Sequence, residues 1–140
     1  MVHDRQLAFG NPLSDEVPIY GCHWNPGEHR DLEMLNVVTG EVRKVVTIAA
    51  VEKQYGDWLQ REFGGRATSI FFPVVSPDQK RVFFKMACGS GGTNFMAKGA
   101  SQRQGLVAYD LAEQRFLFLR EKWGHPAWFP DSRHIMEMGN

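Results

Sequence analysis

The chain has 140 residues, of which 43% are hydrophobic and 12% aromatic, a composition that is typical of a globular domain and argues against a disordered segment. Its 16 basic and 16 acidic residues give a formal net charge of zero, whereas a nucleic-acid-binding protein usually carries a clustered positive excess. No apolar run approaches the ~20 residues that a membrane-spanning helix needs. We therefore expect neither nucleic acid nor membrane as a partner.

The compartment is predicted from the N-terminus and the cysteines. Residues 1–10 have neither the basic start nor the apolar middle of a secretory signal, so the chain as written predicts a cytoplasmic protein. Cys22 and Cys88 are too few for a disulfide scaffold and lack metal-ligand spacing. We interpret them as separate thiols in a reducing compartment, and a single bridge between them is the alternative.

The sequence of the first third of the chain predicts β-strands. Residues 6–9 and 17–24 predict two strands separated by turn-forming residues. Residues 32–38 and 41–48 predict a hairpin that turns at Thr39 and Gly40.

A helix is predicted next, over residues 49–63, because apolar side chains recur there at helical spacing and Gly64 and Gly65 follow. Gly56 weakens the pattern. We interpret this helix as a packing element inserted between sheets, with its apolar stripe laid over a sheet edge.

A second group of strands follows the helix. The apolar runs 70–75 and 82–86 flank the turn Ser76-Pro77-Asp78-Gln79-Lys80. Residues 106–111 and 115–120 predict a second hairpin, in which Asp110 falls where Asn36 falls in the first. Residues 116–119 are all apolar, as expected of a strand covered by sheets on both faces.

The last stretch, residues 124–138, repeats the strand, Pro-Asp turn and strand, and Pro130 lies 53 residues after Pro77. Short strands and turns at such a period are typical of β-propeller blades. We predict an all-β propeller fragment of about three four-stranded blades, roughly residues 1–48, 70–120 and 121–140. Since propellers use four to eight blades, ring closure would need further blades or self-association.

The longest connection, residues 88–104, is polar and rich in glycine and contains Lys98 and Arg103. A long loop inside a blade either carries function or is a disordered tip, and both interpretations stay open. The chain lacks a Gly-x-Ser-x-Gly elbow, a phosphate-binding loop and a His-Glu-x-x-His helix. Hydrolase, kinase and zinc-protease functions therefore lose their usual support.

Histidines and tryptophans supply the remaining candidates. His125 precedes the predicted inner strand of a blade, where side chains line the channel in which propellers place ligands, and His23 is the second candidate. Either is a metal ligand or a structural histidine, since a metal site needs three or four donors. Trp24 and Trp123 flank these histidines and offer flat faces for sugar rings, and core packing is the alternative role.

Two resemblances follow from these motifs. Residues 76–84 resemble the Ser-Pro-Asp-Gly-Lys repeat of TolB-like propellers, with Gln79 in place of the usual glycine, and residues 130–133 are a looser copy. More narrowly, His125-Pro126-Ala127-Trp128-Phe129-Pro130-Asp131 is similar to the His-x-x-Trp-x-Pro-Asp stretch of oligogalacturonate lyases, which hold manganese with histidines and a glutamine. The chain contains no His-x-His pair, and the family's other ligands lie in later blades.

The narrower resemblance implies metal-assisted β-elimination on acidic oligosaccharides. A cation on the uronate carboxylate would stabilise the charge that develops when a base removes the neighbouring proton. His125 would then be a manganese ligand, and Lys98 and Arg103 would bind substrate carboxylates. The alternative function is a non-catalytic propeller module that binds a saccharide or a protein partner.

Overall fold

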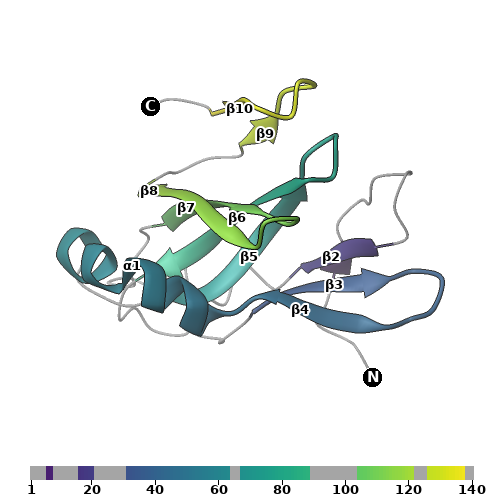
Figure 1. The fold of residues 1–140 in the computed structure, drawn as a ribbon. Coiled ribbons are helices and arrows are strands. Elements are labelled where there is room, and N and C mark those ends of the chain that lie inside the picture. Colours follow the sequence, from purple (N-terminus) through teal and green to yellow (C-terminus); the bar gives the residue numbers. More distant parts are fainter. Residues whose placement is uncertain are drawn as a thin grey trace.

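The structure, a computed structural model, describes residues 6–7, 16–20, 31–63, 67–88, 104–121 and 126–137. Within these residues, strands form three antiparallel sheets, and one helix follows the first sheet in the chain and lies beside the middle sheet (Figure 1). The first sheet contains β1 (Gln6–Leu7), β2 (Glu16–Tyr20), β3 (Leu32–Asn36) and β4 (Val42–Val46), and helix α1 (Ile48–Phe63) follows it. The middle sheet contains β5 (Ala67–Val75), β6 (Arg81–Cys88), β7 (Gln104–Asp110) and β8 (Arg115–Glu121), and the third sheet contains β9 (Ala127–Trp128) and β10 (Ile135–Met136).

Both four-stranded sheets are simple meanders, because strand order in each follows the sequence. The two predicted hairpins are therefore confirmed as the third and fourth strands of their sheets. Predicted unit 1–48 contains the first sheet and unit 70–120 contains most of the middle sheet. Within the described residues, unit 121–140 contains the strand pair β9 and β10. The assignment of these units as propeller blades stays a prediction.

The two hairpins share one turn geometry, which explains why Asn36 and Asp110 fall at matching places. Asn36 Oδ1 accepts hydrogen bonds of 3.0 Å from the backbone N–H groups two and three residues later. Asp110 Oδ1 accepts the corresponding bonds at 3.1 and 2.9 Å. Each turn ends on a residue with positive φ, Gly40 at 76° and Gln114 at 52°. A side-chain oxygen that replaces lost ladder bonds is what favours Asn and Asp at such turns.

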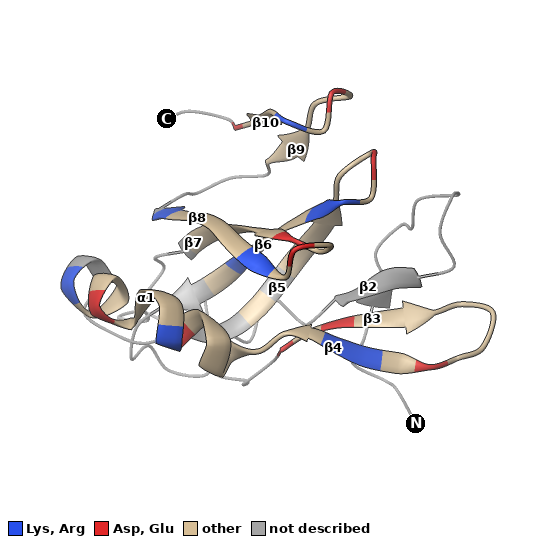
Figure 2. Cartoon of the chain, in the orientation of Figure 1, with Lys and Arg blue, Asp and Glu red and all other residues tan. Residues whose placement is uncertain are grey.

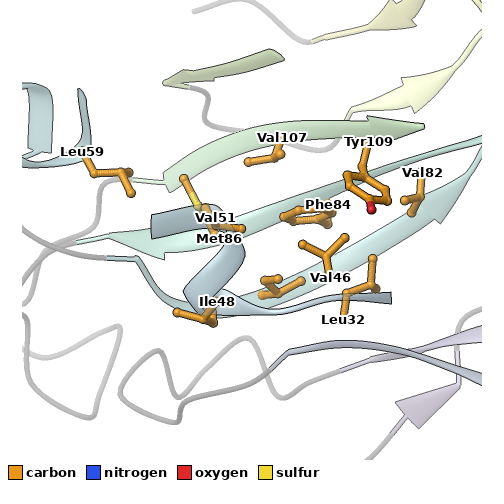
Figure 3. Packing of buried hydrophobic residues seen from close by; sticks show 11 residues of the cluster. Leu32, Val46, Ile48, Val51, Leu59, Val82, Phe84, Met86, Val107 and Tyr109 are labelled. Atoms are coloured by element: carbon orange, nitrogen blue, oxygen red, sulfur yellow. The ribbon is translucent and has the colours of Figure 1, made fainter. Parts of the chain in front are cut away.

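One face of the middle sheet makes the main core (Figure 3). Its side chains pack against α1 and against Leu32 and Val46 of the first sheet. We call this set the first core cluster, and its buried members are Leu32, Val46, Ile48, Val51, Leu59, Ile70, Val82, Phe84, Met86, Val107 and Tyr109.

The opposite face of the middle sheet forms a second core cluster. Phe83, Leu106 and Ala108 are buried there, and Trp128 and Ile135 of the third sheet pack against them. Because neighbouring residues of a strand point to opposite faces, Phe83 and Phe84 enter different clusters. Both faces of the middle sheet are therefore covered, although the run 116–119, which predicted this, lies in the edge strand β8 and its Phe118 is 36% exposed.

Helix α1 begins at Ile48 because Thr47 caps it, with its Oγ1 accepting a 3.0 Å hydrogen bond from the Ala50 N–H. Val51 and Leu59 are fully buried in the first core cluster together with residues of the central strands β6 and β7. The helix therefore lies over the face of the middle sheet, and the prediction that it covers a sheet edge was wrong. No helix within the described residues is long and apolar enough to cross a membrane.

Candidate functional site

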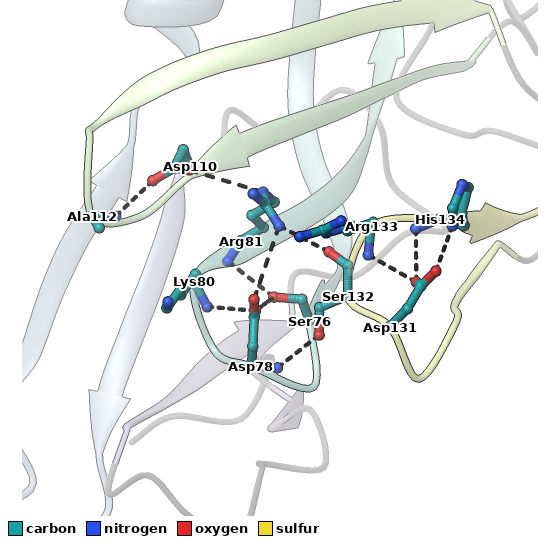
Figure 4. A network of polar contacts seen from close by, with 10 residues as sticks. All are labelled: Ser76, Asp78, Lys80, Arg81, Asp110, Ala112, Asp131, Ser132, Arg133 and His134. Carbon is teal, nitrogen blue, oxygen red and sulfur yellow. Dashed lines mark hydrogen bonds and ion pairs between the residues drawn. The ribbon is translucent and has the colours of Figure 1, made fainter.

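Two turns from different sheets meet at one end of the molecule (Figure 4). They comprise residues 76–81 and 129–134, and we call them the paired-turn junction. In the first turn the Gln79 N–H donates to the Ser76 carbonyl at 2.8 Å, and in the second the Ser132 N–H donates to the Phe129 carbonyl at 3.0 Å. Both are the Pro-Asp turns that the sequence repeat predicted.

Backbone conformation is the same in the two turns. Gln79 has φ of 62° and Ser132 has φ of 58°, so the residue after each Pro-Asp pair is left-handed. Glycine adopts this conformation most easily. The resemblance to TolB-like repeats places glycine at position 79, and the structure gives the physical reason for that preference.

Each aspartate of the junction is held by hydrogen bonds to its own turn. Asp78 Oδ1 accepts from the Ser76 hydroxyl at 2.6 Å and from the Lys80 N–H at 3.0 Å. Burial by itself raises the pKa of Asp78, but these bonds, with Arg81 and Lys80 nearby, bring it below the ordinary value.

The pKa of the second aspartate, Asp131, is lowered more strongly. Asp131 Oδ1 accepts from the N–H groups of Arg133 and His134 at 2.9 and 3.1 Å, and its Oδ2 contacts His134 Nδ1 at 2.5 Å. The Arg133 N–H and the His134 contacts lower the pKa of Asp131 to about 2. The carboxylate is therefore ionised at neutral pH and stabilises the turn.

Two hydrogen bonds join the turns to each other. The Asp78 N–H donates to Ser132 Oγ at 2.9 Å, and the Arg81 guanidinium donates to the Ser132 carbonyl at 3.0 Å. The guanidinium also lies 3.9 Å from the carboxylates of Asp78 and Asp110. Since Ser132 is only 4% exposed, these groups serve to fix the third sheet to the middle sheet.

Trp128 fixes the third sheet at a second point. Its indole Nε1 donates a 2.9 Å hydrogen bond to the Val74 carbonyl, and its ring centroid lies 5.4 Å from that of Phe83. Trp128 therefore has a packing role. The sheets are thus joined by polar bonds at the turns and by aromatic packing between their faces.

A buried lysine, which the sequence reasoning missed, lies on the same face of the middle sheet. Lys85 is 5% exposed, and its Nζ lies 4.9 Å from the ring centroid of Phe72. Burial lowers the pKa of this amine. Phe72 has φ of 52° at an irregularity in the pairing of β5 with β6. A charged residue between Phe84 and Met86, inside the apolar run 82–86, was the available signal.

The predicted site residues lie outside the described residues. This holds for the two candidate metal ligands, the two candidate carboxylate-binding residues and the two candidate sugar-stacking residues: His125, His23, Lys98, Arg103, Trp24 and Trp123. In the part of the chain that the structure does describe, no group of three or more His, Cys, Asp or Glu could hold a metal ion. Figure 2 shows basic and acidic residues interspersed among the described elements.

Comparison with solved structures identifies the type of fold. No family model matches the sequence, and no curated protein matches it. A solved structure from a study of two prolyl endopeptidases, on the role of inter-domain dynamics in catalysis and specificity, matches with a TM-score of 0.54 over 95% of this chain. Prolyl endopeptidase has a β-propeller domain. The fold is propeller-like.

The match gives no information on the activity of this chain. Its sequence identity is 14%, so it shows the fold alone, and this chain spans 17% of the length of that protein. The propeller-like fold agrees with the predicted architecture. It gives no support to oligogalacturonate lyase activity, and the TolB-like and lyase resemblances rest on the sequence motifs.

Proposed function

We propose that this chain is a segment of a TolB-like propeller and acts as a non-catalytic module that binds an acidic oligosaccharide. The paired-turn junction carries the proposal. Asp78 and Arg81 lie 3.9 Å apart, and both, like Asp131, bond to backbone groups of the junction. They hold two sheets in fixed positions, and a rigid scaffold that presents loops is what a binding module requires.

The proposed binding segment is the connection between β6 and β7. Ala87 pairs with Gln104 in the sheet register, so both ends of this connection leave the same end of the middle sheet. The connection contains Lys98 and Arg103, whose positive charges suit uronate carboxylates. A loop held at its base by two paired strands is a common position for a binding site.

Calorimetric titration of the full chain with oligogalacturonate tests this proposal. We expect saturable binding that weakens about tenfold when Lys98 and Arg103 are both replaced by Ala, the loss expected when two charge contacts with the ligand are removed. Lys53→Ala, on the exposed side of α1, is the matched control and should leave the affinity unchanged. Absence of binding by the unaltered chain would overturn the proposal, as would an unsaturated uronate product.

Metal-assisted β-elimination, as in oligogalacturonate lyases, is the second candidate function. One observation favours it: residues 126–131 of the lyase-like motif contain a buried Pro126, strand β9 and the second Pro-Asp turn. His125 precedes them directly in sequence. The described residues do not themselves fit a metal ion, so manganese would depend on His125, His23 and ligands elsewhere.

The second candidate is tested by metal content, measured by elemental analysis after manganese loading and desalting. If it is correct, His125→Ala removes the bound manganese. His134→Ala is the matched control, since His134 is an exposed histidine of the second turn. Equal manganese content in the unaltered chain and the His125→Ala variant would exclude His125 as a ligand.

A further inference from the structure

The outward face of the first sheet carries exposed apolar side chains. Leu35 of β3 pairs directly with Val42 of β4, so the two share a face, and Leu32 and Met34 point the other way. Leu32 and Met34 are buried at 1% and 3% exposure, whereas Val42 is 43% exposed. Val37, in the turn that follows β3, is 54% exposed. We call Leu35, Val37 and Val42 the leading face.

The internal repeat shows what such a face does elsewhere in the chain. Because Asn36 and Asp110 occupy the same turn position, Leu35 and Val42 correspond to the pair Tyr109 and Phe116 of the middle sheet. Tyr109 is buried in the first core cluster, and Phe116 packs against that cluster. In the middle sheet this face is therefore a contact between sheets.

The second apolar surface lies at the opposite end of the stack. In the third sheet Trp128 pairs with Ile135, and both pack toward the middle sheet. Ala127 pairs with Met136 and therefore faces away from it. Met136 is 57% exposed. We call Ala127 and Met136 the trailing face. In Figure 1 the β3–β4 hairpin and the third sheet lie on different sides of the middle sheet.

We propose that the leading face of one copy of this chain packs against the trailing face of a second copy. The residues named for the two faces are apolar, although the charged pair Glu33 and Lys44 shares the leading face with them. Each face corresponds to a face that another sheet covers inside the chain. The contact would repeat between copies the arrangement that the middle sheet makes with its neighbours. Because the two faces differ, the contact is head-to-tail, and such contacts propagate until a ring closes or a filament forms.

Light scattering during size-exclusion chromatography of the full chain tests this contact. We expect the unaltered chain to form either a closed dimer or a larger oligomer. The Val42→Lys and Met136→Lys variants should be monomeric, because each substitution places a charge in an apolar contact. Both positions are exposed in the chain, so the substitutions should leave the fold intact, as circular dichroism would verify. Gln60→Lys, on the exposed side of α1, adds the same charge elsewhere and should leave the mass unchanged.

Mixing the two variants separates this contact from a symmetric one. The Val42→Lys copy keeps its trailing face and the Met136→Lys copy keeps its leading face, so an equimolar mixture should form a dimer and nothing larger. A symmetric contact gives no such rescue. A monomeric unaltered chain would overturn the proposal, and so would a mixture that stays monomeric.

Discussion

Gln79 occupies a backbone conformation that suits glycine better. Its φ of 62° lies in the left-handed region, which costs about 1–2 kcal/mol for a residue with a Cβ. Glycine avoids this strain but loses more conformational entropy on folding, which offsets part of the gain. We expect Gln79→Gly to raise the free energy of unfolding by about 0.5–1 kcal/mol, measured by urea denaturation.

Lys80→Gly in the same turn is the matched control for this prediction. Lys80 is exposed and does not have a positive φ, so glycine there adds entropy to the unfolded chain without relieving strain. We expect a small loss of stability. A loss in both variants would show that the left-handed conformation at position 79 is not strained.

Asp131 makes the stability of the second turn depend on pH. Its pKa is about 2 in the folded chain, below the ordinary 3.8. A depressed pKa means that the carboxylate stabilises the fold above pH ~4 and that this contribution disappears as pH falls from ~3.8 through ~2. We expect the unaltered chain to lose more stability than Asp131→Asn when urea denaturation is repeated between pH 5 and pH 2. Parallel losses in the two proteins would contradict this role.

Secondary structure was predicted well where the signal is local. Asn36 and Asp110 specify their turns through bonds to residues two and three positions away, so neighbouring sequence alone identifies both hairpins. The position of α1 was predicted wrongly, because its apolar stripe fits a sheet edge and a sheet face equally well. Its contact with central strands depends on how the sheets stack, which no local pattern encodes.

Two glycines allow the conformational demands of a helix and a turn to be compared directly. A Cβ added at Gly56, inside α1, or at Gly40, in the first hairpin turn, would meet no atom within 4 Å. Only Gly40 has positive φ, at 76°. We expect Gly56→Ala to raise the free energy of unfolding by about 0.5–1 kcal/mol, and Gly40→Ala to lower it by about 1 kcal/mol.

Thermal denaturation of the two alanine variants measures both effects. Steric differences are excluded by the open space at each position, so the opposite signs would come from the backbone alone. A gain in stability at both positions would mean that the hairpin turn adopts another conformation in solution.

At the scale of the whole molecule, the stacking of sheets produces features that the sequence did not reveal. Lys85 is buried on the face of the middle sheet against which the third sheet packs. Arg81 lies 3.9 Å from Asp110 where the first Pro-Asp turn meets the β7–β8 turn. The candidate ligands His125 and His23 stay predictions, because they lie outside the described residues. The sequence repeat predicts which strands and turns exist. Contacts between side chains far apart in sequence can be identified only when the arrangement of the sheets in space is known.

The third sheet should open separately from the middle sheet, because the described polar contacts between them are confined to the paired-turn junction, the Trp128 indole and the ion pair of Arg120 with Glu137. Replacing Ser132 by Ala removes the hydroxyl that accepts the 2.9 Å bond from the Asp78 N–H, which costs about 1 kcal/mol. We expect exchange of the Phe129 amide, bonded to the His134 carbonyl at 2.8 Å, to accelerate about fivefold in native-state hydrogen exchange. The Phe84 amide, in a strand covered on both faces, should change far less.

Arg133→Ala is the control for this separate opening, since Arg133 lies in the same turn, is exposed, and bonds Asp131 through its backbone N–H, which alanine retains. It should leave the Phe129 exchange rate unchanged. If Ser132→Ala instead accelerated Phe129 and Phe84 equally, the middle and third sheets would open only together. The hydroxyl of Ser132 would then stabilise the whole stack of sheets, because breaking one bond between two turns would lower the stability of the strands at its centre.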